Sequence, residues 1–412
     1  MRILVLDGNE NQAVAAVRSL AKAGHSVVVG SSHSWSKAGW SRFCGATFQY
    51  PAPQVDAERF VKAIAERAGQ ERGGLVLPMT EATTLPLSAH RNLVFAAGAR
   101  LVLPPHSVVL RTFDKSQTTA LAASLGIAVP KTIVISSDEQ AESEATKLTF
   151  PVVVKPRASE EISDTGGVRT SGRPRYARNP AEFWMAYQDV SRRSPAVLVQ
   201  EYVSGEGMGY FALLHNGEVR AEFGHRRIRD VHPSGSGSAV RESVELDPEV
   251  REAGLALLRA LQWDGVAMVE FRRQPGKQPV FLEVNGRFWH SLALACYAEV
   301  DFPALLARMA ESGDVEPISS YRTGVRCRWL LGDVRHLVEV WRGAPPGFPE
   351  AYPGRLRTLL SVLMPVPGTR HDLFNWSDPL PEAGDWLDFV RRMMRHTSQQ
   401  RDLHAQGRYS HS

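Results

Sequence analysis

The sequence predicts an α/β protein of two to three domains that begins with a parallel α/β domain. The chain has 412 residues, whereas a typical domain has roughly 150. Short apolar stretches alternate with amphipathic ones over about the first 112 residues, which is typical of a parallel sheet covered by helices. From about residue 196 strand-like stretches dominate, so a second part rich in strands should follow.

Composition excludes several classes of protein. Apolar residues make up 43% of the chain and charged residues 22%, close to the averages of globular proteins. No stretch approaches the roughly 18 uninterrupted apolar residues of a membrane span, and the start MRILVLDGNEN has too short an apolar run for a secretory signal. Membrane-spanning, fibrous and wholly disordered chains are therefore excluded, and no membrane partner is expected.

The cysteines and the charge balance bear on compartment and partners. Cys44, Cys296 and Cys327 are odd in number and far apart, so a reducing, cytoplasmic compartment is expected rather than a disulfide framework. The 48 basic and 44 acidic residues leave a net charge of +4. Because the arginines spread along the whole chain, they favour solvated surfaces over nucleic-acid binding.

The N-terminal elements form a β-α-β start. Strands are predicted at 2–6 and 26–30 around a helix at about 11–23. The turn Asp7-Gly8-Asn9-Glu10-Asn11 lacks the second and third glycines of a dinucleotide-binding fingerprint, so an NAD enzyme is a weak interpretation. The alternation continues with a helix at about 55–68, a strand at 75–78, a helix from about 81 and a strand at 101–103.

A second region begins at about residue 113. Asp114 can cap a helix that runs to Leu125, and strands at 132–135 and 152–155 flank a helix rich in Glu and Ala. The stretch 158–174 is polar, contains glycines and has no periodicity. It is therefore predicted to be a long loop, a kind of segment that is often functional or mobile.

Strands dominate from residue 197. They are predicted at 197–202, 209–215 and 218–223, with the two-residue turn Asn216-Gly217 joining the last two. The next predicted elements are an irregular loop at 225–238, a helix at 248–261 and a hairpin of strands 265–272 and 279–285. Residues 320–390 mix helix and strand signals, and the last twenty residues are polar and expected to fray.

The final hairpin carries two glutamates whose relative position follows from its turn. If the turn is centred on Gly276-Lys277, Glu270 lies directly opposite Glu283, with Cβ atoms roughly 5 Å apart. Asn285 shares the face of Glu283 because side chains alternate along a strand. Two carboxylates and an amide are therefore expected to converge on one spot.

Opposed like charges within apolar strands call for a cation between them. Hard oxygen ligands favour Mg²⁺ or Mn²⁺, and so small a ligand set implies that water or phosphate oxygens complete the coordination. The alternative is that both glutamates face solvent on an exposed sheet and pair with Arg272 or Arg287.

Weaker signals precede the hairpin. Lys115 opens a helix and Lys155 ends an apolar strand, in a chain that has few lysines. Gly166-Gly167 can offer backbone N–H groups to phosphate oxygens. The segment Gln200-Glu201-Tyr202-Val203-Ser204-Gly205-Glu206 then follows an apolar strand.

Taken in order, these motifs resemble the ATP-grasp superfamily, as found in D-alanine ligases and biotin carboxylase. The resemblance covers about residues 1–315, and its most specific part is the Glu-x-Asn-x-Arg run at 283–287 with its spacing from Glu270. Asn-Gly-Arg-Phe-Trp at 285–289 and Val-Asp-Phe-Pro at 300–303 look closest to a bacterial branch of carboxylate-amine ligase-like proteins.

The resemblance implies a domain order. Residues 1–112 would form the pre-ATP-grasp α/β domain, and residues 113–315 a two-lobed α+β ATP-grasp domain. Its lid would span about 130–200 and its Mg-ATP lobe about 201–315. Residues 316–412 would form a C-terminal extension with a frayed tail.

The resemblance also implies a role for each motif residue. The ATP phosphates would be bound by Lys115, Lys155, Gly166 and Gly167, adenine by the backbone of Glu201 and Val203, and ribose by Glu206. The metal ligands would be Glu270, Glu283 and Asn285, while Arg287 with Arg227 or Arg229 would steady the transferring phosphate. His290 stands where relatives often carry a small residue.

The implied activity is an ADP-forming carboxylate-amine ligase that activates a carboxylate as an acyl phosphate, with ATP and Mg²⁺ (or Mn²⁺) as cofactors. The alternatives are a carboxylase or carbamoyl-phosphate type of ATP-grasp enzyme and a nucleotide-binding regulator without catalysis. Small-molecule carboxylate and amine substrates are expected as partners, with no nucleic acid, and a homodimer is the commonest oligomer. The C-terminal arginines could bind a carboxylate or be solvated: Arg322, Arg326, Arg328, Arg335 and Arg355.

Overall fold

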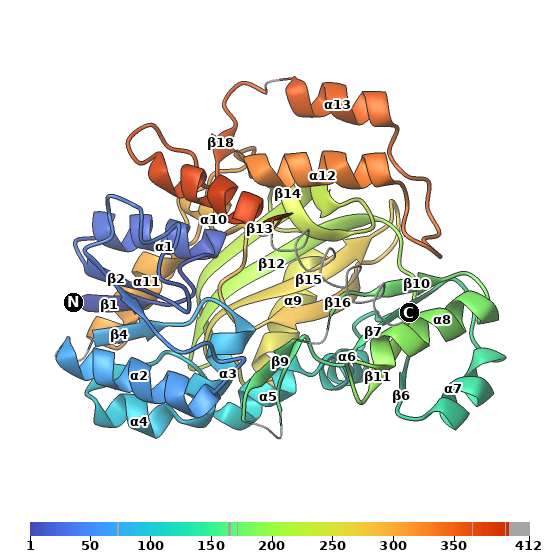
Figure 1. The fold of residues 1–412 in the computed structure, drawn as a ribbon, viewed down its shortest axis with the longest axis horizontal. Coiled ribbons are helices and arrows are strands. Elements are labelled where there is room, and N and C mark those ends of the chain that lie inside the picture. Colours follow the sequence, from blue (N-terminus) through green and yellow to red (C-terminus); the bar gives the residue numbers. More distant parts are fainter. Residues whose placement is uncertain (72–73, 164–165, 171, 365, 392, 395–412) are drawn as a thin grey trace, which may run out of the picture.

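Figure 1 shows the fold as a computed structural model, in which residues 1–71, 74–163, 166–170, 172–364, 366–391 and 393–394 are described. A five-stranded parallel sheet, a four-stranded antiparallel sheet and a seven-stranded mixed sheet follow one another along the chain. The polar tail that is expected to fray lies, apart from residues 393–394, outside the described residues.

The N-terminal part is a five-stranded parallel sheet in the order β3-β2-β1-β4-β5. Its strands are β1 (Arg2–Val5), β2 (Ser26–Ser31), β3 (Ala46–Gln49), β4 (Gly74–Leu77) and β5 (Ala99–Arg100). The helices here are α1 (Asn11–Lys22), α2 (Ala57–Gln70), α3 (Glu81–Ala89), α4 (Arg91–Ala96) and α5 (His106–Phe113). The predicted parallel α/β class is confirmed.

Both faces of this sheet are covered, because successive residues of β1 point to opposite sides. Ile3 packs in the same apolar cluster as Val17 of α1, and Leu4 in the cluster that contains Phe60 of α2. The sequence did not indicate β3, whose residues are mostly exposed. The strand predicted at 101–103 lies instead at Ala99–Arg100.

The second sheet is antiparallel, with the order β10-β7-β11-β6. Its strands are β6 (Thr132–Ile135), β7 (Val152–Pro156), β10 (Arg175–Ala177) and β11 (Val197–Glu201). The helices of this region are α6 (Lys115–Ser124), which precedes the sheet, α7 (Asp138–Ala145) and α8 (Pro180–Ser191). The predicted strand 132–135 and the Asp114 cap of α6 are confirmed.

The stretch predicted as a long loop contains a small two-stranded sheet. Its strands are β8 (Glu160–Ile162) and β9 (Val168–Thr170), while residues 164–165 and 171 lie outside the described part of the chain. Val168 is buried with Ala57 and Ala82 of the N-terminal part. The prediction of a structureless loop is therefore wrong here, because strands of three residues are too short to show periodicity.

The largest sheet has seven strands in the order β16-β15-β12-β13-β14-β17-β18 and is antiparallel except between β17 and β18. Its strands are β12 (Glu206–His215), β13 (Glu218–His232), β14 (Ser236–Ser243), β15 (Gly265–Arg273), β16 (Val280–Asn285), β17 (Arg326–Arg328) and β18 (Arg370–His371). Phe211 packs on one face beside Trp289, and Tyr210 on the other beside Leu257. The covering helices are α9 (Pro248–Ala260), α10 (Leu292–Tyr297) and α11 (Phe302–Ser312).

The irregular loop predicted at 225–238 is wrong. These residues form the far halves of β13 and β14, which pair from His225–Ser243 to His232–Ser236. Register shifts on both sides of Arg229 break the alternation of side chains, and this interruption explains the missing strand signal.

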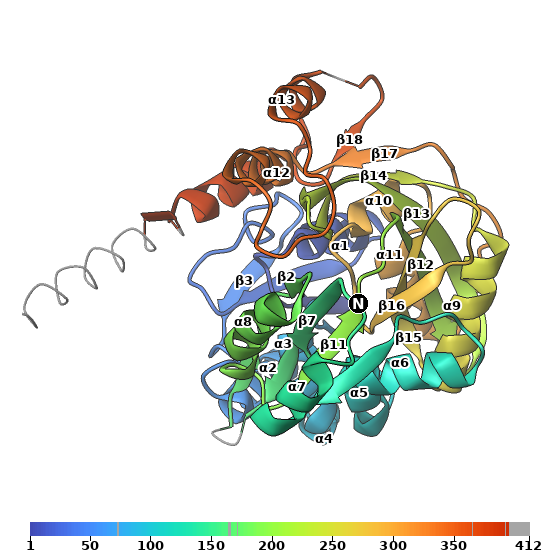
Figure 2. The ribbon, with the colours of Figure 1, turned by 90° about the vertical axis from the view of Figure 1, so that its right-hand side faces the viewer.

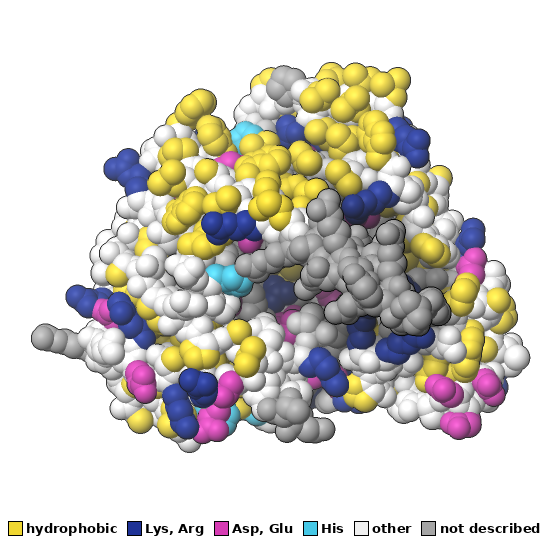
Figure 3. Space-filling model, viewed as in Figure 1, with side chains coloured by type: hydrophobic (Ala, Val, Ile, Leu, Met, Phe, Trp, Pro, Cys, Tyr) yellow, Lys and Arg dark blue, Asp and Glu magenta, His cyan; other side chains and the backbone are white. Residues whose placement is uncertain are grey.

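Among its described residues, the C-terminal region adds β17 and β18 at one side of the large sheet, the helices α12 (Leu330–Arg342) and α13 (Arg355–Leu363), which lie near the top of Figure 2, and a helix over 380–391. Apolar side chains gather over α12 and α13 in Figure 3. The exposed ones include Trp341, Leu356, Leu360 and Leu363. Among the described residues, no helix is both long and apolar enough to cross a membrane.

A buried ion pair fastens this region to the sheet. Arg241 of β14 pairs with Asp372, and both side chains are fully buried. The Cys327 thiol also donates to Asp372 Oδ1 at 3.0 Å. Removal of one partner leaves the other charge uncompensated inside the protein, which typically costs about 3–5 kcal/mol.

We therefore expect Asp372→Asn to lower the free energy of unfolding by about 3–5 kcal/mol, measured by urea unfolding. Asp314→Asn is the control, because Asp314 pairs with Arg220 at 2.6 Å but is 51% exposed, and exposed pairs contribute little. Equal losses in the two variants would contradict a structural role for the buried pair.

Candidate active site

The β15–β16 hairpin brings two carboxylates and an amide together. Glu270 faces Glu283 directly across the two strands, as the sequence predicts. A bulge lies beside this pair: Phe271 faces Phe281, whereas a regular antiparallel pair would place Leu282 opposite Phe271. Asn285 Nδ2 donates to Glu283 Oε1 at 3.4 Å, so all three groups meet at one place.

Each of these groups has a cation beside it. Three contacts form the cluster: Arg227 Nη2 to Glu270 Oε2 at 2.6 Å, Lys115 Nζ to Glu283 Oε2 at 3.5 Å, and Arg287 Nη2 donating to Asn285 Oδ1 at 2.8 Å. Glu270 is 9% exposed, so the alternative in which both glutamates face solvent is wrong. The protein's own cations compensate the opposed carboxylates.

Burial and charge act in opposite directions on the two glutamates. Burial raises the pKa of a carboxyl group, but Lys115, Lys155 and Arg287 together lower the pKa of Glu283 to about 2. Burial raises the pKa of Glu270, and the Arg227 guanidinium opposes that rise. At neutral pH the pair therefore keeps at least the negative charge of Glu283, which suits a divalent cation.

Lys115 is held at the start of α6. The Asp114 carboxylate caps this helix by accepting from two backbone N–H groups of its first turn. The Lys115 backbone N–H donates to Arg157 O at 3.0 Å, which ties α6 to the end of β7. The Lys115 ammonium donates to Ser159 Oγ at 2.9 Å and faces Glu283.

Lys155 lies on β7, opposite Leu198 of β11. Among the described residues, no carboxylate lies within 4.0 Å of its ammonium. Burial, together with the charge of Lys115, lowers the pKa of Lys155 to about 8, although Glu283 and Glu270 oppose this. An ammonium without an ion-pair partner at a cavity wall is suited to an anionic ligand.

These residues line a cavity of about 200 Å³ between the four-stranded and seven-stranded sheets. Seven of the predicted site residues contribute to its wall: Lys115, Lys155, Glu201, Val203, Arg227, Glu270 and Glu283. The cavity wall thus combines cations and carboxylates with the segment after β11.

Arg287 lies two residues after the end of β16 and contacts this cluster. At Gly286, a Cβ atom would lie 2.2 Å from the Trp263 ring, so only glycine fits this close approach. Arg287 Nη1 donates to Phe288 O at 3.0 Å, and Nη2 lies 3.5 Å from Glu81 Oε1. Arg287 therefore reaches Asn285 without lining the cavity itself.

Two other predicted residues do not line the cavity. Glu206 begins β12, its side chain is 47% exposed, and it lies 3.8 Å from Arg226 Nη1. Arg229 pairs with Asp333, and its Nη2 donates to Ser361 O at 2.9 Å. Of the two arginines considered for the phosphate, Arg227 is the one that faces Glu270.

Gly166 and Gly167 pack against the N-terminal part instead of the cavity. Gly166 O accepts from Ala57 N at 2.9 Å. A Cβ atom on Gly167 would lie 2.2 Å from Gln54 O. Their backbone is thus committed to residues 53–57, and the cavity wall near this region is formed by Gly172 and Pro174.

The donor set fits a divalent cation bound together with phosphates. Within the described part of the chain, no group of three or more His, Cys, Asp and Glu side chains could hold a metal ion by itself. Two carboxylates and an amide oxygen are hard ligands but too few to complete the coordination of Mg²⁺. The remaining positions would therefore fall to water or phosphate oxygens, close to Lys115 and Lys155.

Sequence comparison connects this site to known proteins. A family model described as "ATP-grasp in the biosynthetic pathway with Ter operon" matches residues 193–332, which include the whole β15–β16 hairpin. The D-alanine–D-alanine ligase of Ectopseudomonas mendocina is 27% identical over 214 residues, or 48% of this chain and 65% of that ligase. The chain therefore spans slightly less than two thirds of this relative's length.

Solved structures with the same fold agree. The biotin carboxylase domain of Hydrogenobacter thermophilus 2-oxoglutarate carboxylase, solved as a dimer with MgADP, superposes with a TM-score of 0.60 at 16% identity, covering 79% of this chain and 73% of that one. The L-amino acid ligase of Bacillus licheniformis has a TM-score of 0.57 at 15% identity, covering 75% and 73%. By the family-model match, residues 193–332 belong to the ATP-grasp superfamily. The predicted superfamily and fold class are confirmed.

In this ATP-grasp fold, two parts of the cavity wall are only weakly indicated by the sequence. Arg272 donates to Val203 O at 3.2 Å and to Gly235 O at 3.4 Å. It thereby joins the segment after β11 to the turn between β13 and β14. Gly235 has a φ of 104° in that turn, and Ser234 to Gly237 line the cavity. The glycine-rich run HPSGSGS at 232–238 is the available signal, and it falls within the stretch predicted to be an irregular loop.

Proposed function

We propose that this chain is an ADP-forming ligase that activates a carboxylate as an acyl phosphate and joins it to an amine. The observation that carries the proposal is the convergence of Glu270, Glu283 and Asn285 on one spot beside two lysines of the cavity wall. Phosphoryl transfer requires positioning and charge neutralisation more than covalent chemistry from the protein, and this set of residues supplies both.

ATP and Mg²⁺ are the cofactors, and the residues divide between them. Lys115 and Lys155 bind the phosphates, and the backbone of Glu201 and Val203 lies where adenine would bind. Glu270, Glu283 and Asn285 hold the metal, which supplies charge neutralisation at the phosphate oxygens. Arg227 and Arg287 steady the transferring phosphate. Glu206 is retained as the proposed ribose ligand, whereas Arg229 and the Gly166-Gly167 pair are not assigned contacts.

The reaction proceeds in two balanced steps. A carboxylate oxygen attacks the γ-phosphorus, the bond from that phosphorus to ADP breaks, and an acyl phosphate forms. The deprotonated amine then attacks the carbonyl carbon, so a C–N bond forms and the C–O bond to phosphate breaks. The amine's remaining surplus proton leaves with the phosphate as HPO₄²⁻.

The alternatives use the same nucleotide site. A carboxylase or carbamoyl-phosphate type of enzyme would activate bicarbonate, as the biotin carboxylase fold similarity allows. A regulator without catalysis would bind nucleotide and stop there. A complete set of metal ligands favours an enzyme, because binding alone gives no evident need for it.

Hydroxylamine trapping tests the proposal. Carboxylates are screened with ATP, Mg²⁺ and hydroxylamine, and both nucleotides and hydroxamates are analysed. We expect a hydroxamate together with ADP and phosphate for the true substrate. AMP with pyrophosphate would point to an adenylating enzyme, and ATP binding without any turnover would favour the regulator.

The affinity for ATP should fall as pH rises through about 8. Burial and the charge of Lys115 lower the pKa of Lys155 to about 8 in the free protein. Phosphate oxygens favour the charged ammonium and raise that pKa, so binding takes up a proton above pH 8 and weakens by up to about tenfold per pH unit. Calorimetric titrations at pH 7, 8 and 9 measure this, and a Lys155→Met variant should lose the slope. Equal wild-type affinity at all three pH values would contradict the assignment.

Two expectations about the whole protein stay predictions. A homodimer is the commonest arrangement of such chains, and sedimentation of the purified protein would test it. A cytoplasmic location follows from the sparse, separated cysteines.

A further inference from the structure

The C-terminal region connects the two sides of the cavity of about 200 Å³ that is proposed to bind ATP, here called the nucleotide cavity. Helix α12 packs on β13 of the seven-stranded sheet, where His336 Nδ1 lies 2.7 Å from Asp230 O. Residues 343–354 then lead from α12 toward β10 of the four-stranded sheet (Figure 1). Because the nucleotide cavity lies between these two sheets, this connection ties one of its walls to the other.

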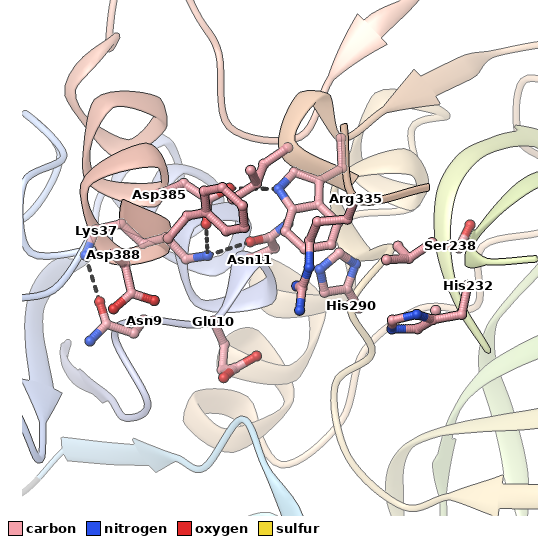
Figure 4. A pocket seen from close by; sticks show the side chains of 15 residues that line it. Asn9, Glu10, Asn11, Lys37, His232, Ser238, His290, Arg335, Asp385 and Asp388 are labelled. Atoms are coloured by element: carbon pink, nitrogen blue, oxygen red, sulfur yellow. Dashed lines mark hydrogen bonds and ion pairs between the residues drawn. The ribbon is translucent and has the colours of Figure 1, made fainter. Parts of the chain in front are cut away.

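Helix α12 starts from a fixed point. Lys37 Nζ lies 2.7 Å from Asp385 Oδ1 and donates to Asn11 Oδ1 at 2.6 Å. Figure 4 shows these contacts, which join the N-terminal part to the helix over 380–391. Trp329, the residue before α12, donates from Nε1 to Asp385 Oδ2 at 2.6 Å. All four side chains are buried, so the connection leaves a part of the protein that is held firmly in place.

Phe348 is the residue with which the connection reaches the cavity wall. Its ring centre lies 5.1 Å from that of Tyr176 and 5.9 Å from that of Tyr202, at interplanar angles of 81° and 89°. Aromatic rings prefer such edge-to-face contacts, and Phe348 is buried. The backbone approaches as closely, because a Cβ atom on Gly347 would lie 2.1 Å from Tyr176 O. The connection is therefore docked on the wall by a fitted contact.

The two tyrosines that Phe348 contacts belong to the nucleotide cavity. Tyr176 and Tyr202 both line it, and their ring centres are 6.1 Å apart. The Tyr176 hydroxyl donates to Ser234 O at 2.8 Å, in the turn between β13 and β14. Tyr202 belongs to the segment after β11, whose backbone is the proposed adenine contact. Phe348 does not line the cavity itself, so it can act on a ligand only through these two rings.

We propose that Phe348 is a positioning residue for the adenine base of ATP, which it serves by holding the rings of Tyr176 and Tyr202 in place. The proposal rests on the nucleotide site of the proposed function. The phosphates would lie at Lys115 and Lys155, so the effect of Phe348 is confined to the base. Because coupling between two binding events is reciprocal, a bound base also holds the connection on the cavity wall.

A comparison of two ligands tests this inference. A non-hydrolysable ATP analogue and inorganic tripolyphosphate, each with Mg²⁺, are titrated calorimetrically into the full-length protein. We expect Phe348→Ala to weaken binding of the analogue about tenfold and to leave tripolyphosphate binding unchanged, because tripolyphosphate has no base. Phe348→Leu keeps apolar bulk and should restore part of the affinity. Trp376→Ala is the control, since it removes a ring of the same region that is 89% exposed, and it should bind both ligands as the wild type does.

Hydrogen exchange of the wild type provides a second measurement that does not depend on a variant that folds. The ATP analogue should slow amide exchange at residues 345–352 by about threefold or more, whereas tripolyphosphate should not. The inference is overturned if Phe348→Ala weakens both ligands equally or neither, or if the two ligands change the exchange equally. Intact binding of the analogue by the wild type would then leave the nucleotide site standing. A wild type that binds neither ligand would overturn that site and this inference together.

Discussion

Replacement of Glu283 by alanine is expected to abolish ATP-dependent turnover while leaving the fold intact. The Glu283 side chain is 30% exposed at the cavity wall, with the Lys115 ammonium 3.5 Å away, so its loss opens space toward solvent rather than in the core. In the proposed site this carboxylate would be a ligand of the metal, whose neutralisation of phosphate charge would contribute several kilocalories per mole. The rate of ADP release at millimolar Mg²⁺ should therefore fall by about 10³-fold or more.

A matched control and a milder variant sharpen this test. Glu218→Ala removes an exposed glutamate from β13 of the same sheet and should leave the rate unchanged. Glu270→Gln keeps an oxygen ligand but removes a charge and the ion pair with Arg227, so a smaller loss in the same direction is expected. Unaltered ATP-dependent turnover in Glu283→Ala would rule out the metal assignment.

Lys155→Met should weaken ATP binding and slow catalysis together. Lys155 lies one residue before the end of β7 at the cavity wall, and among the described residues its ammonium has no ion-pair partner, so its charge is available to phosphate oxygens. Loss of one preorganised charge in such a site typically lowers the rate by about 10²-fold to 10³-fold. Methionine keeps most of the length and the apolar contacts of the lysine stem, so the fold should persist.

Calorimetry separates the two roles that Lys155 could have. Lys147→Met is the control, because Lys147 is 62% exposed and its ammonium contacts Ser143 and Glu144 of α7; this variant should bind ATP as the wild type does. If Lys155→Met also retained wild-type ATP affinity, Lys155 would be a structural residue of the strand.

The cluster of Glu270, Glu283 and Asn285 could be predicted from the sequence because its geometry is local. The alternation along two strands joined by a short turn is enough to put Glu270 opposite Glu283 and Asn285 on the same side. The bulge beside Glu270 was not foreseeable, since nothing in Phe271 or Phe281 distinguishes a bulged from a regular pair. The pairs nearer the turn, Phe271–Phe281 and Arg272–Val280, are displaced by one residue from the predicted register. The bulge cancels this displacement, so Glu270 still faces Glu283 as predicted.

Contacts between segments distant in the chain could not be predicted in this way. The Gly166-Gly167 backbone packs on residues 53–57, about a hundred positions earlier, and no local pattern signals that docking. In the sequence, nothing distinguishes Arg229 from Arg227. The register shifts on both sides of Arg229, however, direct its guanidinium to Asp333. A cavity of about 300 Å³ is likewise lined by both the β1–α1 connection and the helix over 380–391, which only the tertiary fold brings together.

Transfer of oxygen from the carboxylate to phosphate tests the central claim most directly. The acid identified by hydroxamate trapping is labelled with ¹⁸O in its carboxylate and incubated with ATP, Mg²⁺ and the amine, and the released phosphate is analysed by mass spectrometry. Attack of the carboxylate on the γ-phosphorus predicts one ¹⁸O atom in the inorganic phosphate and none in the nucleotide. Label in AMP, or phosphate without label, would contradict activation of the acid as an acyl phosphate.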